Sequence, residues 1–149
     1  MGSQSDYSIM KDCKNILTKL KIKFDVKIIS AHRTPDRMFD FARKAQKNKY
    51  SVIIAGAGGS AHLPGMIASM TILPVIGVPI ESKKLKGLDS LLSIVQMPKG
   101  VPVATVAIDG ALNAGLLAAS IIGTFDEKVK INLDKWKNLQ TKSIKKKPK

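Results

Sequence analysis

The chain has 149 residues and a formal net charge of +14, with 44% hydrophobic but only 5% aromatic residues. This length suits a single domain whose hydrophobic core needs neither disulfides nor a structural metal. The single cysteine, Cys13, excludes an internal disulfide, no CxxC or His/Cys cluster supports a zinc site, and no apolar stretch is long enough to span a membrane.

The first elements are predicted from hydrophobic spacing. Apolar residues recur every three or four positions over residues 5–20, which predicts a helix with Cys13 on its buried side. Residues 24–29 alternate apolar and polar side chains, which predicts a strand. Pro35 then suits the first position of a helix over residues 35–48, with Thr34 as its N-cap.

Strands and helices continue to alternate after this point. We predict strands at residues 52–55, 75–78 (ended by Pro79) and 103–108, and helices at residues 88–95, 111–122, 126–139 and, over about eight residues, up to Met70. The polar, Lys-rich residues 81–87 are predicted to form a mobile loop beside the site, a candidate lid.

This alternation predicts an α/β fold, a three-layer α/β/α sandwich around a parallel sheet. We expect one catalytic domain over residues 1–140 and a basic, disordered tail over residues 141–149. Residues 1–6 resemble the turn between a strand and the first helix, although no strand precedes them. The sheet without such a strand would have a hole at its centre, so we expect residues upstream of Met1 to supply it.

Three turns that follow strands carry the candidate site residues. Residues 30–35 place His32 and Arg33 where a strand becomes a helix. Residues 2–6 offer hydroxyls and a carboxylate at a helix start, and residues 55–61 contain only Gly, Ala and Ser, so that backbone N–H groups can approach a ligand. Because the carboxyl ends of parallel strands share one edge of the sheet, we expect these turns to surround one ligand. We assign His62 a structural role in the pocket wall.

The motifs at residues 1–6, 30–35, 55–66, 74–79 and 93–98 together closely resemble the PurE family. The segments Ala-His-Arg-Thr-Pro and Gly-Gly-Ser-Ala-His-Leu-Pro-Gly-Met are similar to its class I branch, the N5-carboxyaminoimidazole ribonucleotide mutases of purine (IMP) biosynthesis. The resemblance covers Met1 to about Trp136. It departs from the family at Ser60, where Ala is more usual.

The resemblance implies a flavodoxin-like subunit, assembled as a homo-octamer, that uses no metal and no organic cofactor. It implies that His32 is the catalytic proton shuttle in moving a carboxylate from nitrogen to C4 of the imidazole. It also implies a set of residues that bind the nucleotide substrate: Ser3 and Arg33 at the phosphate, Asp6 at the ribose, Ser5 and Ser30 beside them, and Ala57, Gly58, Gly59, Ser60, Ala61 and Leu63 around the base and the migrating carboxylate.

Three other functions remain open from the sequence. A class II-like carboxylase would take CO2 directly on the same fold, and a flavin-binding redox protein would share its architecture but usually needs more aromatic residues. The net charge of +14 favours nucleic-acid binding. The positive residues nevertheless gather in residues 11–27 and 142–149 without an aromatic-studded stripe, so we expect no nucleic-acid partner, no membrane partner and a cytoplasmic location.

Overall fold

A computed structural model of the chain describes residues 1–145 and 147. Its centre is a parallel sheet in the order β1 (Ile53–Gly58), β2 (Val75–Ile80), β3 (Ala104–Thr105). Ile53 lies opposite Val75, and Ile76 lies opposite Ala104. Because all three strands run in one direction, their carboxyl ends share one edge of the sheet, where loops can assemble a site.

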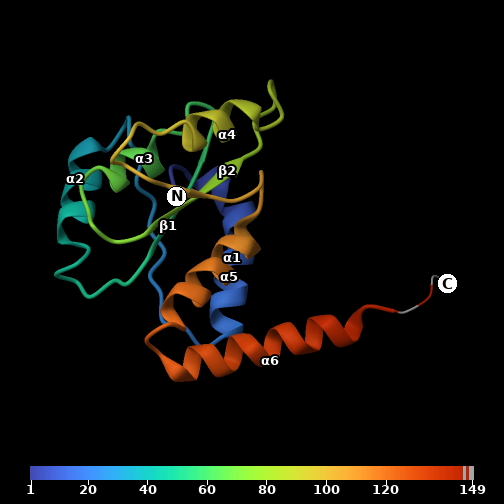
Figure 1. Cartoon of the computed structure of the whole chain (residues 1–149). Coiled ribbons are helices and arrows are strands. Elements are labelled where there is room, and N and C mark those ends of the chain that lie inside the picture. The colour runs from blue at the N-terminus through green and yellow to red at the C-terminus, as the bar shows by residue number, and fades with distance from the viewer. Residues whose placement is uncertain (146, 148–149) are drawn as a thin grey trace.

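Helices cover both faces of this sheet (Figure 1). The described helices are the 3-10 turn η1 (Gln4–Asp6), α1 (Tyr7–Lys19), α2 (Pro35–Lys44), α3 (Leu63–Ala68), α4 (Leu88–Val95), α5 (Ala111–Ile122) and α6 (Glu127–Ser143). On one face Met38 of α2, Ile67 of α3 and Ile94 of α4 are buried in a core with Ile53 and Val75.

The opposite face is covered by α1 and α5, which lie side by side in Figure 1. Met10 and Leu17 of α1 and Ala114 of α5 are buried there with Ile76 and Val78. The two helices approach closely because α5 presents small residues, including a glycine, to α1. The three-layer α/β/α fold with a parallel sheet, as expected from the sequence, is confirmed.

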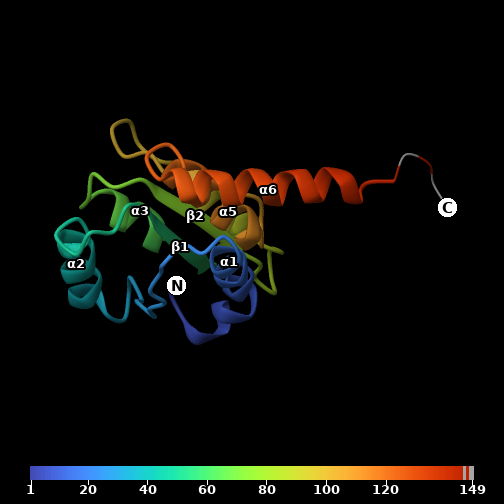
Figure 2. The same cartoon turned by 90° about the horizontal axis from the view of Figure 1, so that it is seen from below.

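Helix α6 begins on the body and then extends away from it (Figure 2). Val129 and Leu133, in its first half, are buried in a third cluster with Ile16 and Leu20. The helix continues to Ser143, three residues into the predicted tail. Residues 146, 148 and 149 of that tail lie outside the described residues. Within the described chain, no helix combines the length and apolar character needed to cross a bilayer.

The prediction of a strand at residues 24–29 is wrong, because these residues are extended but do not belong to the sheet. Of the residues that the structure describes, Met1 and Gly2 bridge them to β1. The Ile29 N–H donates to the Met1 carbonyl (2.8 Å), and the Gly2 N–H donates to the Gly56 carbonyl (3.1 Å). A cavity of about 580 Å³ lies between residues 24–29 and β1. It is the central hole expected for a sheet that has no strand in this place.

The other strand boundaries also differ from prediction. β1 runs on through Ala57 and Gly58, which were predicted to be turn residues, and β3 is only two residues long. β2 includes Pro79 rather than ending before it. The odd-numbered residues of β2 bond toward β3, and Pro79 lies beyond the last residue paired with that short strand. Its missing N–H therefore removes no bond from the sheet.

Helix boundaries agree more closely with prediction. Helices α4 and α5 have the predicted ends. Helix α2 stops at Lys44, four residues early, and α3 at Ala68, two residues early. Thr34 occupies the N-cap position of α2 but makes no side-chain cap, because its hydroxyl donates to the Ser30 carbonyl instead (3.0 Å).

Candidate active site

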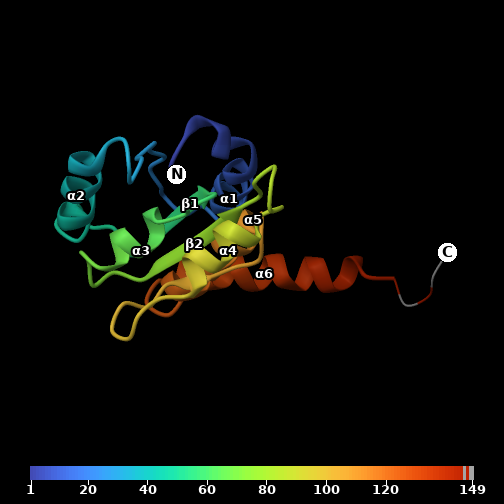
Figure 3. The same ribbon diagram turned by 90° about the horizontal axis from the view of Figure 1, so that it is seen from above.

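A cavity of about 750 Å³ opens at the carboxyl edge of the sheet. In Figure 3 the N-terminal segment, coloured blue, lies beside β1 at this edge. The cavity receives residues from the N-terminal turn, from the start of α2, from the turn after β1 and from the loops after β2 and β3. Its lining is Gly2, Ser3, Ser5, Asp6, Ser8, Ile9, Ser30, Ala31, His32, Arg33, Ala57, Gly58, Gly59, Ser60, His62, Leu63, Ile80, Glu81, Ser82, Lys83 and Asp109.

The N-terminal turn is ordered by one buried carboxylate. Asp6 is only 7% exposed, and its Oδ2 accepts a hydrogen bond from the Ser3 N–H (2.9 Å). The Ser3 hydroxyl in turn accepts from the Ser5 N–H (3.1 Å) and lies in hydrogen-bond contact with the Ser5 hydroxyl. This reciprocal arrangement is a capping box at the start of η1, and it directs two hydroxyls toward the cavity.

The second group of residues precedes α2. The Ser30 hydroxyl accepts from both the backbone N–H and the Nε of Arg33 (3.3 Å each), so it orients the guanidinium. His32 and Arg33 are exposed at the cavity wall. Ala31, which lies between Ile29 and these two residues, is buried. The buried anchor fixes the turn, and the two functional side chains face the open space.

The glycine turn after β1 forms the floor of the site. Gly59 has φ +62°, a left-handed conformation that favours glycine, and an added Cβ there would meet no atom within 4 Å. The backbone of Gly59 therefore borders open space, whereas a Cβ at Gly58 would meet the Ile80 carbonyl oxygen at 3.3 Å. Ala61 does not line it: Ala61 is 1% exposed and packs in the core, which corrects its placement among the lining residues.

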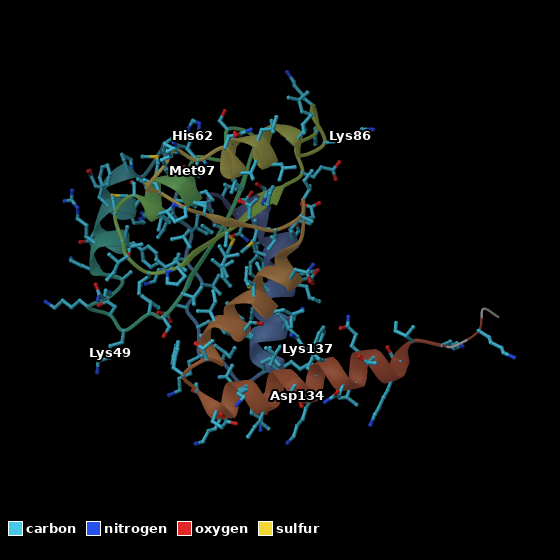
Figure 4. The ribbon with its side chains drawn as sticks, viewed as in Figure 1. Lys49, His62, Lys86, Met97, Asp134 and Lys137 are labelled. Carbon is cyan, nitrogen blue, oxygen red and sulfur yellow. The ribbon has the colours of Figure 1, made fainter. Side chains whose placement is uncertain are left out.

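His62 lines the cavity, as the sequence suggested, but its side chain is exposed and contacts His32. The distance from His32 Nε2 to His62 Nδ1 is 2.8 Å, and the two rings meet edge to face at 85°. Figure 4 shows His62 at the surface beside α3. Because one imidazole must donate and the other accept, each ring restricts the tautomer of the other.

The sequence analysis missed the residues that come from the loops after β2 and β3. Asp109 has φ +57°, and its Oδ1 accepts from the Glu81 N–H (2.9 Å), which joins the two loops. Ser82 and Lys83 line the same cavity, so part of the predicted lid loop borders the site. The Asp109-Gly110 turn after a strand is the signal that was available in the sequence.

The charges around the cavity are mixed. Arg33 and Lys83 bring positive charge, and Asp6, Glu81 and Asp109 bring carboxylates. Among the residues that the structure describes, no group of three or more His, Cys, Asp or Glu side chains is arranged to hold a metal ion. Cys13 lies elsewhere, buried in α1, where desolvation raises its thiol pKa to about 12.

A family model described as "AIR carboxylase" matches residues 1–143. The chain belongs to the AIR carboxylase family. The crystal structure of Treponema denticola PurE superposes on it with a TM-score of 0.86 at 25% sequence identity, covering 95% of this chain and 89% of that one. The flavodoxin-like fold and the PurE resemblance are thereby confirmed.

Several curated members of the AIR carboxylase family bear the name N5-carboxyaminoimidazole ribonucleotide mutase. The Brucella melitensis protein is 56% identical over 99% of this chain and 93% of its own length. The Escherichia coli K12 protein is 53% identical over 97% and 86%, and the Thermotoga maritima protein is 63% identical over 83% and 72%. The match to the Brucella melitensis protein, over 99% of this chain, therefore includes each of the turns that form the cavity.

Proposed function

We propose that this protein is an N5-carboxyaminoimidazole ribonucleotide mutase of purine biosynthesis. The observation that carries the proposal is the gathering of His32, Arg33 and the hydroxyl-bearing N-terminal turn around one cavity of about 750 Å³. The family and the names of its relatives supply the reaction class. The cavity size lies within the range of pockets that enclose small ligands.

In the proposed reaction the substrate first loses its carboxylate from the exocyclic nitrogen as CO2, and that nitrogen takes a proton. The ring carbon C4 then attacks the CO2, and the proton bound to C4 is removed. One proton is gained and one is lost, so atoms and charge balance without a co-reactant. His32 donates the first proton and accepts the second, because the two ring nitrogens of an imidazole allow one side chain to act as both general acid and general base.

The contact with His62 supports this role of His32. A hydrogen bond of 2.8 Å on Nε2 holds the ring at the mouth of the cavity. His62 is also fixed, since its backbone N–H donates to the Ser60 carbonyl (2.8 Å). We infer that His62 orients the imidazole of His32 and exchanges a proton with it between the two halves of the reaction.

The nucleotide part of the substrate is proposed to lie along the N-terminal turn. Ser3 and Arg33 hold the phosphate, and Asp6 accepts from a ribose hydroxyl, with Ser5 and Ser30 completing the set. The base and the CO2 lie over Ala57, Gly58, Gly59 and Ser60, next to Leu63. Small residues there leave room for the ring and exclude water once the loop after β2 closes over it.

We propose that the functional form is a cytoplasmic homo-octamer without nucleic-acid or membrane partners. Large apolar side chains exposed on the single chain support burial against other copies: Leu88 and Leu92 on α4 are 52% and 47% exposed, and Leu139 on α6 is 64% exposed. We expect sedimentation equilibrium to give eight times the mass of one chain at micromolar concentrations. A monomer would contradict the assembly.

The test of the function is a direct assay with the purified protein. N5-carboxyaminoimidazole ribonucleotide is offered in one reaction, and aminoimidazole ribonucleotide with bicarbonate in another. Conversion of the first to 4-carboxy-5-aminoimidazole ribonucleotide supports the mutase. Rapid turnover of the second alone would assign the chain to direct carboxylation and overturn the proposal.

Replacing Arg33 with alanine is expected to raise the KM for the nucleotide about tenfold, because a charged hydrogen bond to the phosphate is lost. The effect on kcat should be smaller, since Arg33 lies away from the transferred proton. Arg43→Ala is the matched control: Arg43 lies near the other end of α2, outside the cavity lining, with its guanidinium over the Phe39 ring. Steady-state kinetics measures both, and an unchanged KM in Arg33→Ala would remove Arg33 from the phosphate site.

A further inference from the structure

Lys83 and Arg33 are the two lysine or arginine side chains in the lining of the candidate active site. The proposed function assigns Arg33 to the phosphate and leaves Lys83 without a role. Within the described chain the ion pairs lie inside α2 and inside α6, so no carboxylate is within ion-pair distance of the Lys83 ammonium. An unpaired cation beside a cavity is available to an anionic group of a ligand.

The two cations come to the cavity from opposite sides. Arg33 lies just before α2, whereas Lys83 lies in the loop that follows β2. Figures 1 and 3 show the N-terminal segment between these two parts of the chain. Gly58 at the end of β1 lies opposite Ile80 at the end of β2, so the loop that carries Lys83 begins beside the glycine turn. The glycine turn therefore lies between the two cations, next to the loop of Lys83.

Asp109 fixes the first residues of this loop. Its backbone N–H donates to the Pro79 carbonyl (2.8 Å), and its Oδ1 accepts from the Glu81 N–H (2.9 Å). In a parallel ladder a backbone carbonyl would accept that second bond, so the carboxylate extends the pairing of β2 beyond its last strand residue. The left-handed backbone of Asp109 (φ +57°) belongs to this arrangement. The chain is therefore held in place two residues before Lys83.

Two serines join the loop to α4. The Ser82 hydroxyl donates to Asp89 Oδ1 in the first turn of that helix (2.9 Å). Ser90 is fully buried, and its hydroxyl lies within hydrogen-bond distance of the carbonyls of Ile80 and Gly87 (2.8 and 2.9 Å), one at each end of the loop. Both ends of the loop are thus fixed by side chains. Little backbone ordering is then required when an anion binds to the lysine that the loop carries.

We propose that Lys83 is a substrate-binding residue whose ammonium contacts the carboxylate on the imidazole end of the nucleotide, while Arg33 contacts the phosphate at the other end. The inference rests on the proposed function, which places the base and the carboxylate over the glycine turn. Glu81 and Asp109 bring negative charge to the same side of the cavity and would repel a carboxylate there. The unpaired ammonium of Lys83 offsets that repulsion. Lys83 therefore selects the carboxylated nucleotide over the same nucleotide without its carboxylate.

The experiment compares the binding of two nucleotides that differ by that one carboxylate. Titration calorimetry at constant ionic strength measures the Kd of 4-carboxy-5-aminoimidazole ribonucleotide and of aminoimidazole ribonucleotide, without bicarbonate. The variants of the full chain are Lys83→Met, which removes the charge but keeps a long side chain, and Lys83→Arg, which keeps the charge. Lys84→Met is the matched control, because Lys84 is the next residue of the same loop, is also exposed and lies outside the cavity lining.

Lys83→Met is expected to raise the Kd of the carboxylated nucleotide about tenfold and to leave the Kd of aminoimidazole ribonucleotide within about twofold of the wild type. Lys83→Arg should restore most of the affinity, and Lys84→Met should change neither Kd.

Equal weakening of both nucleotides in Lys83→Met would place the ammonium at the phosphate and overturn the proposal. An unchanged Kd in Lys83→Met, or an equal loss in Lys84→Met, would also overturn it. The titrations involve no turnover. A wild-type protein that binds both nucleotides but converts neither would refute the mutase function, while the carboxylate contact would still be judged by the measured Kd values.

Discussion

Replacing His32 with asparagine is expected to lower kcat by about 10² to 10⁴-fold while leaving nucleotide affinity within about threefold of the wild type. The asparagine side chain fills part of the volume of the histidine side chain and retains hydrogen-bonding atoms, but it cannot donate and then accept a proton near neutral pH. The loss should therefore fall on the chemical step. Single-turnover conversion measures that step, and titration calorimetry with the product nucleotide measures affinity.

His62→Asn is the comparison that separates proton transfer from ring positioning. His62 contacts the reacting side chain through one hydrogen bond of 2.8 Å, so its loss should lower kcat by about tenfold at most. Wild-type turnover in His32→Asn, or lost binding with preserved single-turnover chemistry, would contradict the assigned role. A loss in His62→Asn equal to that in His32→Asn would make the pair of rings, rather than His32 alone, the proton-transferring unit.

The helices could be predicted well from the sequence because the residues in and around each helix indicate where it lies. A glycine precedes α4, and glycines lie at both ends of α5. These local signals do not depend on the rest of the fold. A strand, in contrast, forms only where its backbone can pair with a neighbouring strand. Residues 24–29 have the composition of a strand, yet they form no part of the sheet, because within the described chain their backbone pairs with Met1 alone. Alternation predicts extended backbone, but pairing decides whether it becomes a strand.

The site could be predicted where a local motif combined with the general rule for where loops gather in a parallel sheet. His32, Arg33 and the glycine turn each follow an extended or strand segment, and parallel topology brings such turns to one edge. The contact between His32 and His62 joins residues thirty positions apart, and no periodicity encodes it. Asp109 was missed for a similar reason. The Asp109-Gly110 pair indicated a turn, but the bond of Asp109 to the loop after β2 exists only once that loop has folded beside it.

Asp6→Ala is expected to lower kcat/KM about 10²-fold and to lower the free energy of unfolding by about 1–3 kcal/mol. Asp6 is 7% exposed and its carboxylate accepts from the Ser3 N–H at 2.9 Å, so alanine leaves that donor without its partner. The Ser3 hydroxyl then loses its fixed position at the proposed phosphate site. Activity and stability should fall together because one group orders the turn and contacts the ribose.

Asp6→Asn separates these two duties. An amide oxygen still accepts from the Ser3 N–H, so the turn and most of the stability should be retained, whereas the negative charge offered to a ribose hydroxyl is lost. We expect kcat/KM to fall about tenfold and the unfolding midpoint to stay near that of the wild type. Steady-state kinetics and urea unfolding of both variants make the comparison. If Asp6→Asn lost as much stability as Asp6→Ala, the charge rather than the acceptor would hold the turn, and full activity in Asp6→Ala would exclude the carboxylate from the site.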